Sequence, residues 1–262
     1  MIDGAVVSVQ DITVLEDMER SRHEFLGMVS HELRSPLAVI KATAETILRA
    51  GQPLDVADAD ELREVVSEQV SRMKELLDNL LDISAVESGH LAVRSEPLDL
   101  CLTAEEAIAI FRRSTGNRRK LELLCPSSLP LVSADRCRIL QVLTNLLSNA
   151  NKFSPPEGEI RVEVEYRAGA VAVKVSDHGM GIPPEMQDRL FRKFSRLNTR
   201  VEGTGLGLVI SKGIIEAHGG KIRAESAGEG KGAAFTFTLP GLEGDDSQSP
   251  SPAAPRKGGR GE

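Results

Sequence analysis

Two long stretches of the sequence carry apolar residues at steps of three and four. In the first, which runs from Val14 to Leu48, the apolar positions are 15, 18, 25, 29, 33, 37, 40, 44 and 47. The second runs from Leu62 to Ile83 in alternating steps of four and three. Residues at this spacing share one face of a helix, so the sequence predicts two long amphipathic helices. Pro36, inside the first helix, predicts a kink there.

The segment between these helices predicts how they assemble. Gly51 and Pro53 end the first helix, so the two helices form a hairpin. A single hairpin cannot bury both apolar stripes, whereas two hairpins together form a four-helix bundle. We therefore predict a homodimer, although periodicity alone would favour a purely structural coiled coil.

After residue 96 the pattern changes to a mixture of helix and strand. Apolar clusters and alternation predict helices at 101–114, 135–152 and 206–218, and strands at 120–124, 159–166, 170–176, 220–225 and 233–239. Gly, Ser and Pro dominate after Pro240, which predicts a flexible tail. The predicted domains are a helical hairpin at 14–92 and an α/β domain at 93–240, between an N-terminal remnant at 1–13 and a disordered tail at 241–262.

The composition argues against several classes of function. The 32 basic and 39 acidic residues give a net charge of −7, which disfavours a nucleic-acid binder. No apolar stretch approaches the ~20 residues that span a bilayer, so we expect a soluble, cytoplasmic segment without membrane contact. The cysteines at 101, 125 and 137 have no CxxC spacing and are expected to be reduced, buried side chains.

His31 is the first candidate for chemistry. It lies off the apolar stripe of its helix, so its ring is expected to face solvent. Most exposed histidines have no catalytic role, but Glu32 is adjacent to this one and Ser35 lies one turn further along the same face. A carboxylate beside an imidazole can hold the proton of one ring nitrogen and leave the other nitrogen free as a nucleophile.

Asn145, Asn149 and Lys152 recur at steps of four and three in the helix predicted at 135–152. They therefore share one helical face. Amide oxygens suit Mg²⁺, and a lysine suits phosphate oxygens. The alternative is an ordinary polar face on a surface helix.

Two glycine-containing segments follow. In the first, Asp177 ends a predicted strand and precedes Gly179 and Gly181, so a backbone could approach a flat ligand closely. A carboxylate there would accept a hydrogen bond from the amino group of adenine and repel the oxo group of guanine, which favours ATP over GTP. The alternative is a simple glycine-rich turn.

The second segment, 203–208, opens the helix predicted at 206–218. Amide groups at a helix N-terminus favour an anion, but the spacing matches neither a Rossmann fingerprint nor a P-loop. Arg196 lies between the two glycine segments in an expected lid, from which it could reach a terminal phosphate. Phe191 and Phe194 are expected to anchor that lid in the core.

Together and in this order, these segments resemble the bacterial sensor histidine kinases of two-component systems, from about Leu15 to Pro240. The corresponding motifs are the H box at 30–37, the N box at 145–153, the first glycine box at 177–181, the F box at 190–197 and the second glycine box at 203–208. The resemblance implies an α+β fold, in which a dimeric helical hairpin precedes an α/β sandwich ATP-binding domain with a mixed sheet.

The resemblance also implies a role for each site residue. His31 would accept the γ-phosphoryl group of ATP, Glu32 would take its ring proton, and Asn149 would bind Mg²⁺. The phosphoryl group would then pass to an aspartate of a response regulator. The residues implied to contact ATP are Asn145, Asn149, Lys152, Phe153, Asp177, Gly179, Gly181, Arg196, Thr204, Gly205, Leu206 and Gly207.

Two further features bear on activity and input. Ser35 replaces the more usual threonine at the position that orients water for dephosphorylating the partner, which leaves phosphatase activity open. Residues 4–13 resemble the last strand of a PAS sensor domain, which would then lie upstream.

Two other functions remain as alternatives. A GHKL-type ATPase, as in chaperones, would hydrolyse ATP without His31, and the H box on the preceding hairpin argues against it. A non-catalytic dimeric scaffold would only bind nucleotide or regulator, and the intact Glu32 and Asn149 argue against that.

Overall fold

The computed structural model describes residues 13–49, 55–115, 119–187, 189–191 and 205–242. The chain divides into two compact units, Met1–Asp78 and Asn79–Glu262. The predicted N-terminal strand, the turn residues Gly51 and Pro53, and most of the predicted tail lie outside the described residues. None of the helices in the described ranges combines the length and the apolar character needed to cross a membrane.

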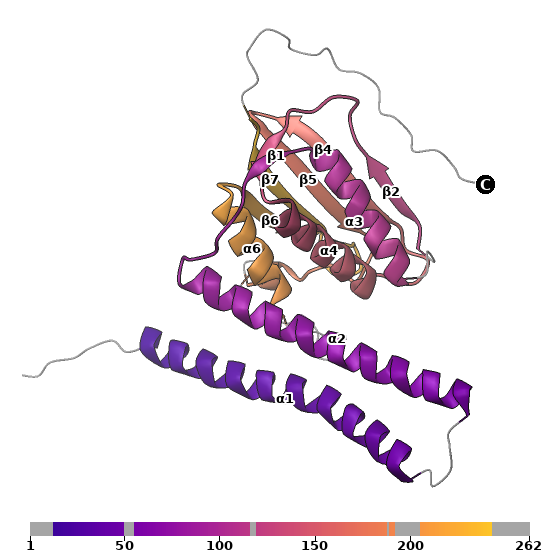
Figure 1. Ribbon diagram of the computed structural model, residues 1–262. Helices are drawn as coiled ribbons and strands as arrows, with labels where there is room; N and C mark the ends of the chain where they lie inside the picture. Colours follow the sequence, from indigo (N-terminus) through magenta and orange to yellow (C-terminus); the bar gives the residue numbers. More distant parts are fainter. Residues whose placement is uncertain (1–12, 50–54, 116–118, 188, 192–204, 243–262) are drawn as a thin grey trace, which may run out of the picture. The chain divides into compact units, whose positions relative to one another are not determined.

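The first unit is built from two long helices (Figure 1). Helix α1 spans Thr13–Arg49, and α2 spans Val56–Glu87, of which the residues up to Asp78 belong to this unit. Pro36 lies inside α1 and is buried. The helical hairpin predicted from the three-four periodicity is confirmed.

The second unit contains a five-stranded mixed sheet in the order β2-β4-β5-β7-β6. Only the β2–β4 pair is parallel, and the other neighbouring pairs are antiparallel. The strands are β2 (Leu121–Leu124), β4 (Ile160–Arg167), β5 (Ala170–Asp177), β6 (Lys221–Glu225) and β7 (Ala234–Pro240). A separate antiparallel pair joins β1 (Glu96–Leu98) and β3 (Val132–Ala134).

Three helices pack on one face of this sheet (Figure 1). They are α3 (Leu100–Thr115), α4 (Arg136–Phe153) and α6 (Gly207–Ala217), and a short helix α5 (Pro184–Gln187) follows the first glycine box. The buried residues of α4 recur at helical spacing: Ile139, Val142, Leu143, Leu146, Leu147 and Ala150. The α+β fold with an α/β sandwich is confirmed.

Alternation along the strands separates the two faces of the sheet. In β4, Ile160, Val162 and Val164 are buried. The intervening side chains form cross-strand ion pairs on the other face, such as Lys174 Nζ to Glu163 at 3.1 Å. This alternation places the helices on the apolar face.

The last turns of α2 belong to the second unit. Both carboxylate oxygens of the buried Asp82 are hydrogen-bonded to α4, one to Arg138 and one to Gln141, each at 2.7 Å. Val86 packs so closely on Gly213 of α6 that a Cβ there would lie 2.5 Å from it. The unit therefore begins within α2 at Asn79.

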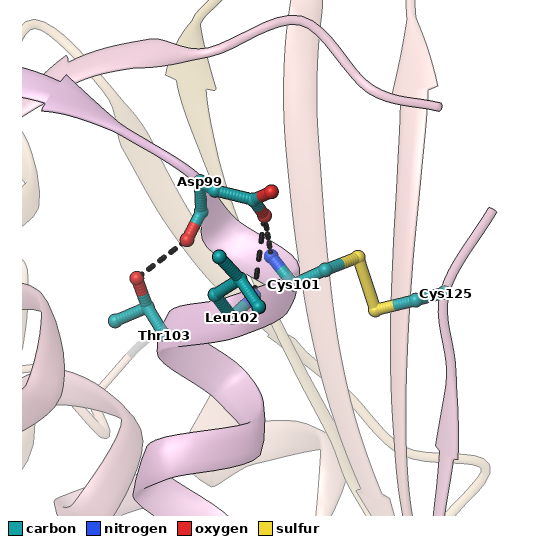
Figure 2. The surroundings of a disulfide bond; sticks show 5 residues. All are labelled: Asp99, Cys101, Leu102, Thr103 and Cys125. Atoms are coloured by element: carbon teal, nitrogen blue, oxygen red, sulfur yellow. Dashed lines mark hydrogen bonds between the residues drawn. A yellow bond between two sulfur atoms is a disulfide. The ribbon is translucent and has the colours of Figure 1, made fainter. Parts of the chain in front are cut away.

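The prediction of reduced, buried cysteines was wrong. Cys101 in the first turn of α3 and Cys125 just after β2 form a disulfide, with their Cα atoms 6.0 Å apart (Figure 2). Cys137 is free and exposed. The pairing depends on a tertiary contact between segments 24 residues apart, which Cys spacing alone does not reveal.

Asp99 fixes the first turn of α3 beside this disulfide (Figure 2). Its Oδ1 accepts hydrogen bonds from the N–H groups of Cys101 at 2.8 Å and Leu102 at 3.1 Å. Its backbone carbonyl accepts from Thr103 Oγ1 at 2.6 Å. The two bonds to Oδ1 satisfy amide groups that a helix start leaves without intrahelical partners.

Candidate active site

His31 lies on α1 with its side chain exposed. Glu32 is half-buried and Ser35 is exposed one turn further on. The predicted solvent-facing position of His31 is therefore confirmed for the chain as described. His31 and Ser35 are four residues apart on α1, so helical geometry places them on the same face, and Glu32 is the next residue along the chain.

The N-terminus of α4 is held by Asp135. Its Oδ1 caps the helix by accepting from the N–H of Arg138 at 3.2 Å, and its Oδ2 accepts from the N–H of Arg94 at 3.0 Å. Burial would raise the pKa of Asp135, but these hydrogen bonds outweigh it and lower the pKa below its usual value. Asp135 thus fixes the N-terminal end of the helix that carries the N box.

Asn145 connects α4 to the start of α6. Its Nδ2 donates to Ser211 Oγ at 2.9 Å. A Cβ on Gly207 would collide with the Asn145 amide, so this close approach requires glycine. The N box and the second glycine box are therefore in direct contact.

The other N-box residues occupy the last turn of α4. Asn149 and Phe153 are half-buried, and Lys152 is exposed with its Nζ 5.6 Å from the centre of the Phe153 ring. The Phe153 carbonyl accepts a hydrogen bond from the N–H of Met180 at 3.1 Å. This bond joins the end of α4 to the first glycine box.

Asp177 ends β5 with a buried carboxylate. Its Oδ1 accepts from the N–H of Gly179 at 2.8 Å. Burial raises the pKa of Asp177, because desolvation disfavours the charged form more than this and other hydrogen bonds favour it. A nearby ligand that donates a hydrogen bond would stabilise the carboxylate.

Gly181 follows in the same turn with φ +72°. A Cβ there would collide with the carbonyl of Gly228, in the loop between β6 and β7. Both the backbone angle and the contact require glycine at this position. The turn therefore packs on that loop.

The second glycine box is described only from Gly205 onward. Leu206 is completely buried. Arg196, Thr204 and Phe194 lie outside the described residues. Within the second unit, the structure brings together N-box residues, both glycine boxes and Asp177.

Comparison with known proteins identifies the same two parts. Residues 21–89 match the His Kinase A (phospho-acceptor) domain. Residues 134–243 match the family of histidine kinase-, DNA gyrase B- and HSP90-like ATPases. The catalytic domain of histidine kinase ThkA is 32% identical, with a TM-score of 0.51 over 56% of this chain and 96% of that one.

The chain belongs to the sensor histidine kinase family.

Two longer matches agree. The sensor protein KdpD of Clostridium acetobutylicum is 37% identical over 230 residues, which are 86% of this chain and 25% of that protein. The Acinetobacter baumannii histidine kinase AdeS has a TM-score of 0.63 at 28% identity, covering 81% of this chain and 98% of the solved one. This histidine kinase chain thus spans a quarter of the length of its curated relative KdpD.

Sequence reasoning missed Arg119, which holds the end of the N-box helix. Its guanidinium donates hydrogen bonds to four backbone carbonyls: Pro155 at 2.8 Å, Gly158 at 3.2 Å, Asn151 at 3.2 Å and Ser154 at 3.3 Å. The cation also complements the negative end of the α4 dipole. No local sequence pattern predicts these hydrogen bonds, because their partners lie more than thirty residues from Arg119 in the chain.

The loop after β6 was missed as well, although the sequence carried a signal. Gly228, Gly230 and Gly232 alternate with other residues, and all three have positive φ. Ser226 lies at the start of this loop, and its Oγ accepts a hydrogen bond from the N–H of Ile182, the residue after the first glycine box. The alternating glycines could have been recognised as a third turn.

Proposed function

We propose that this chain is the autophosphorylating core of a sensor histidine kinase. It would transfer the γ-phosphoryl group of Mg·ATP to His31 and then to an aspartate of a response regulator. The observation that carries the proposal is the buried Asp177 carboxylate in a turn hydrogen-bonded to the end of the N-box helix. The proposed domains are the hairpin at 14–92 and the ATP-binding domain at 93–240.

Adenine recognition is assigned to the first glycine box. The Asp177 carboxylate would accept from the 6-amino group, and the turn at Gly179 and Gly181 would lie against the base. Phe153 would lie along the nucleotide. A guanine would face the same carboxylate with its oxo group, so ATP should bind better than GTP.

Phosphate binding is assigned to the other segments. Asn145 and Lys152 would lie near the phosphates, and Arg196 would meet the γ-phosphate. The lid and phosphate end would be lined by Thr204, Gly205, Leu206 and Gly207. The contact between Asn145 and Gly207 supports a common phosphate region.

The donor set fits Mg²⁺. Among the described residues, no group of three or more His, Cys, Asp or Glu could hold a metal by itself. Mg²⁺ commonly takes few protein ligands together with substrate phosphates, and the amide oxygen of Asn149 is such a ligand. When bound, the ion would neutralise phosphate charge.

Chemistry at His31 begins with a proton transfer. Glu32 would accept the proton of one ring nitrogen, while the other nitrogen forms a bond to the γ-phosphorus. The bond from that phosphorus to the β,γ-bridging oxygen breaks, and ADP leaves. In the second step the N–P bond breaks and an aspartyl phosphate forms on the regulator.

The partners follow from this reaction. Histidine kinase ThkA has been solved in complex with the response regulator protein TrrA, with a TM-score of 0.59 and 24% identity to this chain. A homodimer would bury the apolar stripes of the hairpin. An upstream PAS domain would supply the signal, and Ser35 could support dephosphorylation of the regulator.

The test is incubation of the purified chain with γ-labelled Mg·ATP. We expect an acid-labile, alkali-stable label on the wild type and none on His31→Gln or Asn149→Ala. His90→Gln is the matched control, because His90 is also an exposed histidine. Label that persists in His31→Gln would contradict the proposal, and ADP release without any label would support the GHKL-type ATPase instead.

A further inference from the structure

The loop between β6 and β7, residues 226–233, runs along the backbone of the first glycine box. Three backbone hydrogen bonds join the two segments: Asp177 N–H to the carbonyl of Ala233 at 2.9 Å, Gly232 N–H to Gly179 at 3.1 Å, and Gly230 N–H to Met180 at 2.7 Å. The position of the turn that carries the predicted adenine contacts therefore depends on this loop.

The Ser226 hydroxyl lies at the centre of this arrangement. Its Oγ accepts from the N–H of Ile182 at 3.0 Å and from the N–H of Gly228 at 3.2 Å. It donates to the carbonyl of Gly232 at 2.6 Å. A single hydroxyl thus binds both ends of its own loop and the residue that follows Gly181.

Ser226 is half-buried, and its partners from the glycine-box side are buried. Ile182 is 2% exposed, and Gly181 and Gly232 are buried. Removing the hydroxyl would leave the Ile182 amide in the interior without its partner, which is costly. The turn would then have to shift toward another acceptor.

A second contact fixes the serine itself. Gln187, in α5, donates from Nε2 to the backbone carbonyl of Ser226 at 3.0 Å. Because α5 begins two residues after Ile182, this bond closes a ring from Ile182 through Ser226 to Gln187. The hydroxyl is therefore held in place on both sides.

We propose that Ser226 is a positioning residue for adenine recognition. It acts through the backbone of Ile182, which sets the turn of Gly179 and Gly181 and with it the direction of the Asp177 carboxylate. This inference rests on the proposed function, in which that turn contacts the base. Ser226 acts on the adenine side, so it affects nucleotide affinity and base selectivity rather than the rate of phosphoryl transfer.

The test is the affinity of the full chain for ADP, measured by calorimetry, for wild type and Ser226→Ala. We expect the Kd to rise about tenfold, as the loss of a buried hydrogen-bond partner predicts. The KM for ATP should rise by the same factor, while kcat for labelling of His31 stays within about twofold. The preference for ATP over GTP should fall.

Ser226→Thr keeps the hydroxyl and should restore most of the ADP affinity. Ser176→Ala is the matched control, because Ser176 Oγ donates only one 3.5 Å bond, to the carbonyl of Arg161 on the neighbouring strand. If Ser226→Ala fails to fold, Ser226→Cys, with its weaker donor and acceptor, takes its place and should bind ADP with intermediate affinity.

Wild-type affinity and selectivity in Ser226→Ala or Ser226→Cys would overturn the inference, as would a fall in kcat at unchanged Kd. ADP binding requires no phosphoryl transfer, so a wild type that binds ADP without labelling His31 refutes the proposed kinase and still lets binding decide the role of Ser226. A wild type that binds neither ADP nor ATP refutes both.

Discussion

The two compact units present their reactive groups in opposite ways. In the first, His31, Glu32 and Ser35 lie within five consecutive residues of one helix, and His31 is exposed. In the second, the site is assembled from the end of α4, the end of β5 and the start of α6, with buried hydrogen bonds between them.

This difference teaches where chemistry and folding are coupled. A substitution at His31 removes a reactive group that supports little of the surrounding structure. A substitution in the nucleotide site also removes a contact that holds two elements together. Variants in the two units should therefore separate the loss of activity from the loss of stability.

Replacing His31 should abolish phosphorylation without destabilising the chain. Because the side chain is exposed, His31→Gln should keep the midpoint of thermal unfolding within about 2 °C of the wild type, as for most surface substitutions. Labelling from γ-labelled ATP and a thermal melt of the same preparation check both parts. A large drop in the melting temperature would show that His31 also supports the folded structure.

Removing the disulfide should cost the second unit stability. For segments 24 residues apart, the double variant Cys101→Ser, Cys125→Ser should lose about 3 kcal/mol of unfolding free energy through a freer unfolded chain. Urea unfolding measures the loss. Cys137→Ser, at the free exposed cysteine, is the control and should unfold like the wild type. An unchanged midpoint for the double variant would show that the bond contributes nothing.

Arg119→Gln should weaken both stability and nucleotide binding. It removes hydrogen bonds to four carbonyls in the last turn of α4 and the segment that follows it. A loss of about 2 kcal/mol follows if one or two of these carbonyls stay without partners. Urea unfolding and ADP calorimetry check the two effects together. Arg161→Gln, which loses only a partly exposed ion pair with Glu122, is the matched control.

Should Arg119→Gln lose stability while its affinity for ADP stays unchanged, the end of α4 would not couple folding to binding. The comparison between the units would then hold for stability alone.

The smallest expected effect on stability is that of Asp177→Asn, which changes how the unfolding free energy depends on pH. The pKa of Asp177 is raised by burial, so the folded state binds a proton more readily than the unfolded state. This contribution is fully present below the ordinary value of 3.8 and is lost as pH rises through the raised pKa of the folded state. Asp177→Asn should flatten that part of the profile of unfolding free energy.

Urea unfolding of the wild type and Asp177→Asn from pH 3.5 upward, in about half-unit steps, measures this profile. Superimposable profiles would mean that burial of the Asp177 carboxylate does not influence stability.

The sequence predicted what depends on local pattern. The helices at 101–114, 135–152 and 206–218 correspond to α3, α4 and α6, and His31 is exposed as its position off the apolar stripe predicted. Three-four periodicity is a property of consecutive residues, so one sequence is enough to read it.

The features that the sequence did not predict depend on contacts between segments that are far apart in the chain. The short strands β1 and β3 pair only because the chain brings residues 96–98 and 132–134 together. The disulfide of Cys101, the four carbonyls around Arg119 and the hydroxyl of Ser226 likewise join segments that are far apart in sequence. Their residue types carry no local signal of these partners.

The most direct test of the separation between the units is an ADP titration of two variants side by side. We expect His31→Gln to bind ADP with the wild-type Kd. Asp177→Asn should bind ADP at least about tenfold more weakly, because an amide replaces the carboxylate that accepts from adenine. Weakened binding in His31→Gln together with unchanged binding in Asp177→Asn would contradict this expectation.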